Sequence, residues 1–493
     1  MNYYNKEIIF GYNFLKKKAI DCCHNGNIEE AISCVEKLSV VANQLNWTYH
    51  DEDLSCLVDE LSRKLFLPFG DEYLPIKKRA VFYDQYGKSF ILALQYIDAL
   101  IHAGYEILYI LSDYVEADPY TFIIDELRAK SGVTVVLIPL SKPFKERGEE
   151  IIRQTREFAP EKLFLHVKMF SVFNLVLPAI SPKCVKYYID LQDHAMWIKN
   201  HQIDYVIPYR LFGATIEMEK RGFAKEQVLH IPYYPIIRES SFKGFPQSVA
   251  GKIIIFTGGE LYKTMDKNNT YWRIVAQLLV ENPSVVVLYA MKGKAAVFGK
   301  QAMEQYGKSV MERFIQIGFR SDINEVFRHC DIYLGTSPMS GGLMCQYAAY
   351  NAKPILQYYD PQMAVNNETE QVLNYNGKTS ISFTDEHELL QEAKRLVDDE
   401  TYRKDRGKAI QKCLITKSQF DELFAQTIDS NVNCCPLEPL HINYKAFEDW
   451  WFYLEKCGIS KCREYLLSLL KKDKYKIMPL SAVVQWLNHR SAQ

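Results

Sequence analysis

The chain has 493 residues, of which 48% are hydrophobic and 24% are charged, so a large buried core is available. At roughly 100–200 residues per domain, this length predicts two or three domains. Its 59 basic and 60 acidic side chains leave a net charge of −1, which argues against a general nucleic-acid binder because such proteins carry a basic surplus.

The N-terminal stretch, the length of the apolar runs and the cysteines indicate the cellular compartment of the protein. Glu7 and Asn13 interrupt the apolar N-terminal stretch and no small-residue cleavage site follows, so we expect no secretory signal. Runs such as 133–140 are far shorter than the ~20 residues that span a bilayer. The 12 cysteines show no zinc-site spacing and are interpreted as reduced and structural. We therefore expect a cytoplasmic protein, with peripheral membrane contact through basic clusters such as 16–18 left open.

Residues 1–70 are predicted to form a helical cap. Ile28, Ile32 and Val35 recur at three- and four-residue steps and give one apolar helix face. The segment resembles a tetratricopeptide unit, but no second copy follows at a fixed period. A short cap is therefore expected instead of a repeat array.

The next region, residues 78–237, is predicted to be an N-terminal Rossmann-like domain that takes the acceptor. Short apolar strands alternate in it with amphipathic helices, a pattern typical of a parallel sheet covered on both faces. The predicted strands are 80–83, 107–111, 133–138, 163–167, 185–189, 205–207 and 228–231, and the predicted helices are 89–102, 145–158 and 172–180.

A polar stretch at 238–250 is interpreted as a linker to a second Rossmann-like domain at 251–385, which is expected to hold a nucleotide sugar. Its predicted strands are 253–256, 285–289, 314–317, 332–334 and 354–356, and its predicted helices are 270–281, 300–312, 322–329 and 342–350. The fold class is therefore α/β with two facing Rossmann-like domains, whose strand ends are expected to line one cleft.

Residues 386–493 are predicted to form a C-terminal helical region. Phe447, Trp450, Trp451 and Leu454 stand at helical spacing in it. A tryptophan pair at this spacing is more typical of core or interdomain packing than of a sugar platform, so we predict packing.

The most informative segment runs from Asp331 to Pro354. A hydroxyl-rich loop follows a predicted strand there, and Ser340, Gly341 and Gly342 come directly before a predicted helix. The N–H groups and dipole at a helix start favour a phosphate, glycines let the phosphate approach, and a serine donates a further hydrogen bond. We predict that these three residues bind the donor.

A second donor-binding segment follows the first strand of the second domain. Gly258 and Gly259 permit close backbone approach, and Lys263 or Lys267 is predicted to neutralise a diphosphate leaving group. A fixed cation stabilises the charge that develops as a nucleoside diphosphate departs. The pattern leaves the choice between the two lysines open.

A third segment follows a strand of the first domain. Asp193 and His194 are predicted catalytic residues because a histidine titrates near neutrality, as a general base requires, and Trp197 is predicted to stack on the acceptor. Asp84 and Gln85 follow the first strand and are further candidates for acceptor binding, with helix capping as the alternative.

Absent motifs narrow the chemistry. The chain contains no GxGxxG, Walker A, HExxH or GxSxG pattern. Its Asp-x-Asp sequence, Asp51-Glu-Asp53, lies in the predicted cap. We therefore expect no metal site and no cofactor, with protein cations and a helix dipole acting in place of a divalent ion.

These segments resemble the GT-B glycosyltransferases. The likeness rests on the Gly-Gly-x4-Lys stretch from Gly258 and on the stretch from Asp331 to Pro354, and Asp193 to Trp197 is similar to bacterial enzymes related to the O-GlcNAc transferases and adhesin glycosyltransferases or to group 1 glycosyltransferases. The resemblance implies a UDP-linked donor. It also implies a ribose ligand near 346, where Gln346 stands in place of the usual carboxylate.

The resulting functional prediction is transfer of a sugar, hexosyl or N-acetylhexosaminyl, from a nucleotide-sugar donor to a glycan, lipid-linked or protein acceptor, as in polysaccharide biosynthesis. Two alternatives share the fold. A sugar-nucleotide epimerase needs several carboxylates and histidines, which are scarce at 340–347. A non-catalytic binding subunit is favoured by the missing ribose carboxylate and opposed by the glycines and lysines.

Overall fold

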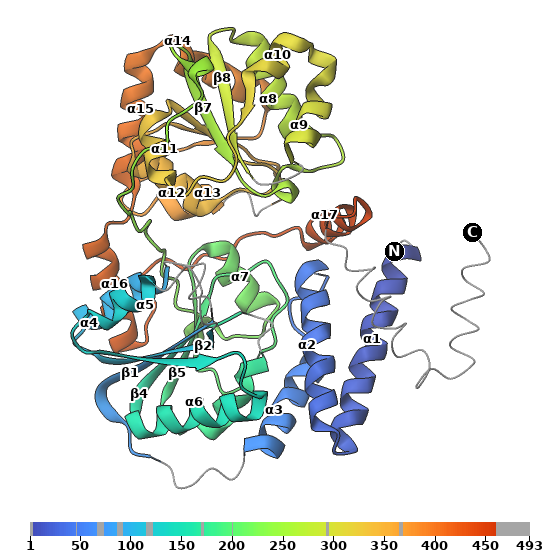
Figure 1. Cartoon of the computed structure of the whole chain (residues 1–493), viewed down its shortest axis with the longest axis vertical. Helices are drawn as coiled ribbons and strands as arrows, with labels where there is room; N and C mark the ends of the chain where they lie inside the picture. Colours follow the sequence, from blue (N-terminus) through green and yellow to red (C-terminus); the bar gives the residue numbers. More distant parts are fainter. Residues whose placement is uncertain are drawn as a thin grey trace.

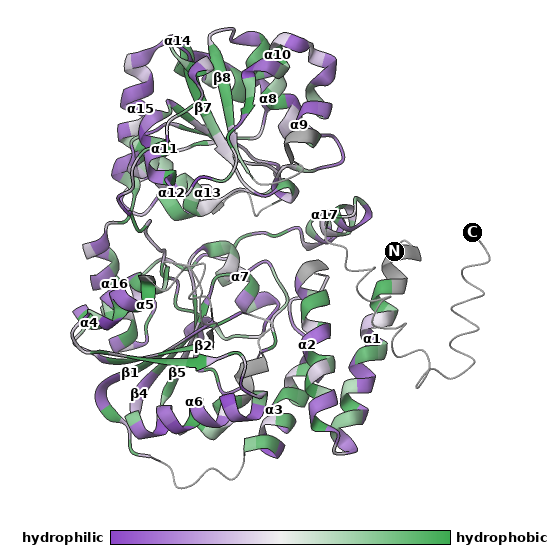
Figure 2. Cartoon of the chain, in the orientation of Figure 1, coloured by the Kyte–Doolittle hydropathy of each residue, from purple (hydrophilic) through white to green (hydrophobic). Residues whose placement is uncertain are grey.

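A computed structural model describes residues 3–45, 47–66, 73–85, 92–114, 122–168, 172–199, 201–291, 295–363 and 368–459 of the chain. Figure 1 shows two α/β domains one above the other, with the N-terminal helices beside the lower one. Apolar residues concentrate on the strands, whereas hydrophilic residues cover the outer side of helices such as α15 (Glu400–Cys413) (Figure 2). No described helix combines the length and apolar character that crossing a bilayer requires.

The N-terminal cap consists of α1 (Tyr3–His24), α2 (Ile28–Leu45) and α3 (Glu52–Phe66), which confirms the helical prediction. Its basic cluster faces acids of the same cap. Nζ of Lys16 lies 3.0 Å from Asp51 and 2.9 Å from Asp53. The positive charge of this cluster is therefore partly neutralised within the cap.

The lower domain contains a six-stranded sheet in the order β3-β2-β1-β4-β5-β6, with every pairing parallel. Alternate residues of a strand face opposite sides, so Val81 of β1 joins the core beneath the cap whereas Phe82 joins the core beneath α4. The strands are β1 (Ile76–Asp84), β2 (Glu106–Tyr114), β3 (Val133–Pro139), β4 (Pro160–His166), β5 (Val185–Asp190) and β6 (Tyr205–Pro208). The helices are α4 (Leu92–His102), α5 (Phe122–Arg128), α6 (Phe144–Phe158), the 3-10 helix Val172–Ala179 and α7 (Leu211–Glu219).

The upper domain repeats this topology in its own parallel sheet, ordered β12-β11-β10-β7-β8-β9. The helix and strand predictions at 270–281, 332–334 and 342–350 match α8, β10 and α12. The strands are β7 (Ile253–Gly258), β8 (Val285–Ala290), β9 (Phe314–Gln316), β10 (Ile332–Leu334), β11 (Ile355–Tyr358) and β12 (Ser382–Phe383). The helices are α8 (Thr270–Glu281), α9 (Ala295–Met303), α10 (Lys308–Arg313), α11 (Ile323–His329), α12 (Gly342–Tyr350), α13 (Glu368–Leu373), α14 (Glu386–Asp398) and α15.

The C-terminal segment returns from the upper to the lower domain. The helix α16 (Lys417–Ser430) packs on α4 of the lower domain, where Phe420 and Phe424 join the core. The chain then reaches α17 (Tyr444–Lys456), which lies between the domains beside the cap (Figure 1). Helical structure between 386 and 430 and from 444 is thus confirmed within the described residues.

Two predicted elements are wrong. Residues 228–231 do not form a regular strand: a bridge joins Val228 to Val206, and the N–H groups of Leu229 and Ile231 donate to the carbonyls of Val206 and Pro208 at 2.8 and 3.0 Å. The ladder does not continue because Pro208, the last residue of β6, has no N–H to donate back. The helix predicted at 300–312 is broken into α9 and α10, because Gly307 adopts a φ of 92° that a helix does not allow.

The structure predicts an acid-dependent loss of stability through His230. Burial lowers the pKa of His230 to about 4, below its usual value of about 6.5. The unfolded chain then binds more protons in this window, so the free energy of unfolding should fall by on the order of 2 kcal/mol between about pH 7 and pH 5. Urea unfolding of the His230→Gln variant should show a shallower pH slope. The exposed control His387→Gln should keep the wild-type slope, and an unchanged slope in His230→Gln would contradict the assignment.

Candidate functional site

Each sheet has one point where the strand order reverses, between β1 and β4 below and between β7 and β10 above. Ligands of open α/β sheets bind outside the carboxyl ends of the strands at this point. The loops after β7 and β10, which carry the predicted donor residues, therefore lie side by side although about 80 residues separate them in the sequence. One apolar cluster joins both loops to the lower domain through Met265, Met339 and Phe212.

Lys263 occupies the centre of this upper site. Its Nζ donates to the carbonyl oxygen of Ser340 at 3.3 Å, and the N–H of Met339 donates back to the carbonyl of Lys263 at 3.3 Å. A Cβ added to Gly341 would lie 3.9 Å from the same Nζ. The N-cap residue of α12 is Gly341, which makes no side-chain cap to the first N–H groups of the helix. A cation beside an uncapped helix start is an arrangement that binds phosphate.

The structure distinguishes the two lysines and the two glycines. Lys267 is exposed, whereas Lys263 is half-buried at the start of α12. A Cβ on Gly258 would meet the carbonyl oxygen of Ala290 at 2.9 Å, so Gly258 is needed for strand packing, and the approach of a ligand to its backbone stays a prediction. Gly259 faces the β10 loop, where its added Cβ would lie 3.4 Å from Cγ2 of Thr336.

Gln346 does not occupy a ribose-binding position. Its side chain is fully buried, and Nε2 donates to the carbonyl oxygens of Tyr233 at 2.6 Å and Val372 at 3.2 Å. It therefore ties α12 to the segment that joins the two domains. The predicted ribose contact is wrong because a ribose cannot reach a side chain with no exposed surface.

A buried ion cluster underlies the predicted catalytic loop of the lower domain. Nε and Nη2 of Arg210 donate to the two carboxylate oxygens of Asp193 at 2.5 and 2.6 Å. Arg221 contacts Glu217 at 2.5 Å and Asp190 at 3.1 Å, and it also donates to the carbonyls of residues 193 and 195 at 3.1 and 2.6 Å. All five side chains are buried. The loop that carries His194 is thus held from below by two guanidinium groups.

The pKa values of the acids in this cluster shift in opposite directions. Burial works to raise the pKa of Asp193, but the charge of Arg210 outweighs it and holds this pKa well below the usual range. Burial raises the pKa of Asp190, and it raises the pKa of Glu217 well above its ordinary value. If Asp190 and Glu217 share one proton, the three carboxyl groups carry two negative charges, which match the two positive charges of the guanidinium groups.

His194 is the accessible titratable group of the loop. Its side chain is 25% exposed, and Nδ1 lies 3.6 Å from Oδ1 of Asp193, which is longer than a hydrogen bond. Asp193 is only 1% exposed, so it positions the loop, and its predicted direct action on the acceptor is wrong. Trp197 is fully buried between Tyr188 and Phe223, at ring-centroid distances of 4.4 and 5.4 Å, so the predicted acceptor contact is wrong there too.

The ends of β1 and β4 bring Asp84 and His166 together. Oδ1 of Asp84 lies 2.9 Å from Nδ1 of His166, and Oδ2 accepts a short hydrogen bond from the hydroxyl of Tyr109. Asp84 has no exposed surface, so its predicted acceptor contact is wrong because both oxygens are engaged inside the protein. Gln85 is 8% exposed, and its acceptor contact stays a prediction. His166 was not among the predicted site residues, although it stands at the end of an apolar strand.

The helix α17 joins the two halves of the site. Nε1 of Trp450 donates to the carbonyl of Met265 at 2.7 Å, next to the turn that carries Lys263. The Trp451 ring stacks on His194, with centroids 5.9 Å apart and planes 8° apart, and also on Tyr262 at 6.0 Å. The prediction that the tryptophan pair serves interdomain packing is confirmed.

Comparison with known proteins identifies the fold. No protein-family model matches the sequence, and no curated protein is similar to it in sequence. Among solved structures, a mutant O-GlcNAc transferase of Thermobaculum terrenum is similar over 93% of this chain and 85% of its own, with 12% identity and a TM-score of 0.51. Anabaena Alr3699/HepE, solved with UDP and glucose, is similar over 72% of this chain and 100% of its own, with 15% identity and a TM-score of 0.52. The chain therefore has the GT-B fold, with a helical cap before it and helices after it.

Proposed function

We propose that this GT-B chain transfers a sugar from a UDP-linked donor to a glycan, lipid-linked or protein acceptor without a metal ion. The observation that carries the proposal is the placement of Lys263 beside the uncapped start of α12, at the reversal point of the upper sheet. The likeness in fold to a protein that binds UDP and glucose supports the choice of donor.

In this proposal the diphosphate lies against the first N–H groups of α12, with Nζ of Lys263 beside it. Negative charge grows on the diphosphate as the sugar departs, and a preorganised cation and helix dipole stabilise it more in the transition state than in the bound donor. Lys263 is held by the carbonyl of Ser340, so little reorganisation is needed. These groups take the part that a divalent ion plays in metal-dependent transfer.

His194 supplies the second half of the proposed mechanism. It projects from the loop that Arg210 and Arg221 hold, on the side where α17 reaches the β7 loop of the upper domain. A neutral imidazole there accepts the proton of the acceptor hydroxyl as that oxygen attacks the sugar carbon, and the nucleoside diphosphate departs with the bonding electrons. The stacked Trp451 orients the ring and Asp193 positions the loop, and neither touches the acceptor.

Binding of the nucleotide tests the proposal directly. We expect UDP and UDP-sugars to raise the midpoint of thermal unfolding, whereas GDP and CMP do not. Ligand that binds only the folded state stabilises it by about 2.7 kcal/mol at a hundredfold excess over the dissociation constant. The shift should be the same with and without Mg²⁺.

Three other results of the nucleotide experiments would contradict the proposal or favour another function. A shift that needs Mg²⁺ would contradict metal-independent binding. No shift with any nucleotide would overturn the proposal and favour a non-catalytic binding subunit. Binding of UDP-N-acetylglucosamine followed by conversion to its 2-epimer, without transfer to any acceptor, would favour an epimerase.

A further inference from the structure

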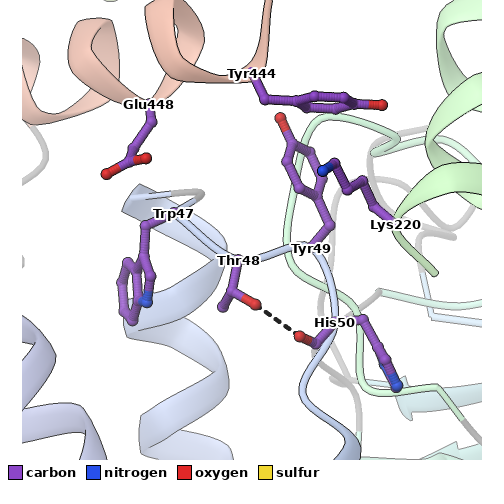
Figure 3. A pocket seen from close by; sticks show the side chains of 7 residues that line it. All are labelled: Trp47, Thr48, Tyr49, His50, Lys220, Tyr444 and Glu448. Carbon is purple, nitrogen blue, oxygen red and sulfur yellow. Dashed lines mark hydrogen bonds between the residues drawn. The ribbon is translucent and has the colours of Figure 1, made fainter. Parts of the chain in front are cut away.

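A hollow of about 290 Å³ lies where the cap, the end of α7 and the first turns of α17 meet, outside the donor site (Figure 3). Its volume is at the small end of small-molecule sites, which enclose roughly 300–1,000 Å³. It therefore fits one ring-sized ligand. The lining residues are Trp47, Thr48, Tyr49, His50, Lys220, Tyr444 and Glu448.

The aromatic rings of the hollow stand at steep angles to each other. Tyr49 meets Tyr444 edge to face, with centroids 5.6 Å apart and planes 74° apart, and Trp47 is fixed edge-on against Tyr12 at 5.1 Å and 88°. A nucleobase binds best between parallel rings, and perpendicular rings offer no such slot. Apolar C–H faces of a non-planar ring can pack against them instead.

Charges of both signs exclude strongly charged ligands. Nζ of Lys220 lies 4.1 Å above the Tyr444 ring, in the place that a cationic ligand would take over an aromatic face. The Glu448 carboxylate lines the same hollow and repels a phosphate or carboxylate. A neutral ligand that both donates and accepts hydrogen bonds suits this pair of charges.

Two buried polar groups at the hollow have unmet hydrogen-bonding capacity. Among the described residues, none pairs with the hydroxyl of Tyr49, whose side chain is only 6% exposed, or with Nδ1 of His50. The other ring nitrogen of His50 lies 2.8 Å from Glu52, and Thr48 donates to the carbonyl of His50 at 2.6 Å (Figure 3). A buried polar group without a partner costs free energy, which a ligand hydroxyl would recover.

We propose that this hollow binds one neutral pyranose ring of a glycan acceptor. Trp47 and Tyr444 pack against the C–H face of the sugar, while Lys220, Glu448 and Tyr49 hydrogen-bond its hydroxyl groups. The acceptor role rests on the proposed sugar transfer, but binding of the ring does not.

The position of the hollow suits a second sugar unit of the acceptor. The N–H of Trp197 donates to the carbonyl of Tyr49 at 3.1 Å, so the floor of the hollow is joined to the loop that carries His194. On α17, Glu448 faces the hollow, and Trp451, which stacks on His194, lies three residues later, a rise of about 4.5 Å along the helix. A ring in the hollow would thus leave the next sugar near His194.

Saturation-transfer NMR on the full chain with cellobiose, chitobiose, lactose and maltose tests this site. We expect at least one disaccharide to bind with a dissociation constant on the order of 1 mM. Trp47→Ala should weaken that binding about tenfold, because stacking on an aromatic face supplies about 1.4 kcal/mol of it. Glu448→Gln, which keeps the shape of the side chain, should weaken it in the same sense if the Trp47 variant is unstable.

The neighbouring substitution Asp449→Asn is the matched control, because Asp449 pairs with Lys445 and does not line the hollow. It should leave disaccharide binding unchanged, and all three variants should keep the thermal shift by UDP. Disaccharide binding that both hollow variants leave intact, or no disaccharide binding by a wild-type chain that binds UDP, overturns the site. Disaccharide binding without any UDP binding supports the site and overturns the proposed sugar transfer.

Discussion

Replacing Lys263 by alanine should lower the affinity for UDP by about 10- to 100-fold, because a hydrogen bond to a charged group contributes roughly 1.5–3 kcal/mol. The rate of sugar transfer should fall further, by about 10²- to 10³-fold, because the same cation faces charge that develops only as the diphosphate departs. Isothermal titration with UDP and initial rates with a UDP-sugar measure the two effects separately.

Lys267 provides the matched control for this experiment. It stands four residues later on an exposed part of the same loop, so Lys267→Ala removes the same charge from the region without disturbing the start of α12. UDP affinity should stay within about twofold of wild type, since surface charges contribute little. Equal losses in both variants would mean that general positive charge, and not the geometry at Ser340, attracts the nucleotide.

Replacing Arg210 by methionine should have the largest effect on stability. Asp193 would then be left buried and ionised without its partner, and breaking a buried ion pair costs about 3–5 kcal/mol. Arg210 holds the pKa of Asp193 below its unfolded value, so the stabilisation is present above about pH 4 and is lost as the pH falls further. The midpoint of the first urea-unfolding transition should fall at neutral pH.

Two further variants show whether the buried charge is the cause. Adding Asp193→Asn to Arg210→Met removes the unpaired carboxylate and should restore a large part of the lost stability. Arg153→Met breaks pairs with Glu150 and Glu157 at the surface of α6 and should cost only about 1 kcal/mol. A double variant as unstable as Arg210→Met would show instead that lost packing of the arginine side chain dominates.

The parallel sheets follow from local patterns in the chain. Apolar runs such as 253–256 and 285–289 have no polar alternation, so each must be buried on both faces, and the helices between them carry one apolar side. The signals for α8 and α12 are equally local, and both helices have the predicted bounds. The break at Gly307 was missed because a glycine inside an apolar helical pattern need not end a helix.

The sequence was sufficient where only the position of a loop had to be predicted. Strand ends followed by glycines, such as 258–259 and 341–342, meet at one edge of the sheet because parallel strands end on the same side. Prediction failed where exposure of a side chain mattered. Trp197 and Asp84 also follow strands, but Tyr188, Phe223 and Tyr109 enclose them, and these partners come from other parts of the chain.

The two parallel sheets and the loops that carry Lys263 and His194 can thus be read from the chain, because each depends on residues close in sequence, whereas the short elements α5, α7, α13 and β12 were not predicted. Tertiary packing decided which of those side chains are accessible. Arg210 pairs with Asp193 across 17 residues, and Trp451 reaches His194 from the far C-terminal helix. The sugar-sized hollow needs residues 47–50, 220 and 444–448 together, and only the packing of the cap and α17 on the lower domain brings these segments to one place.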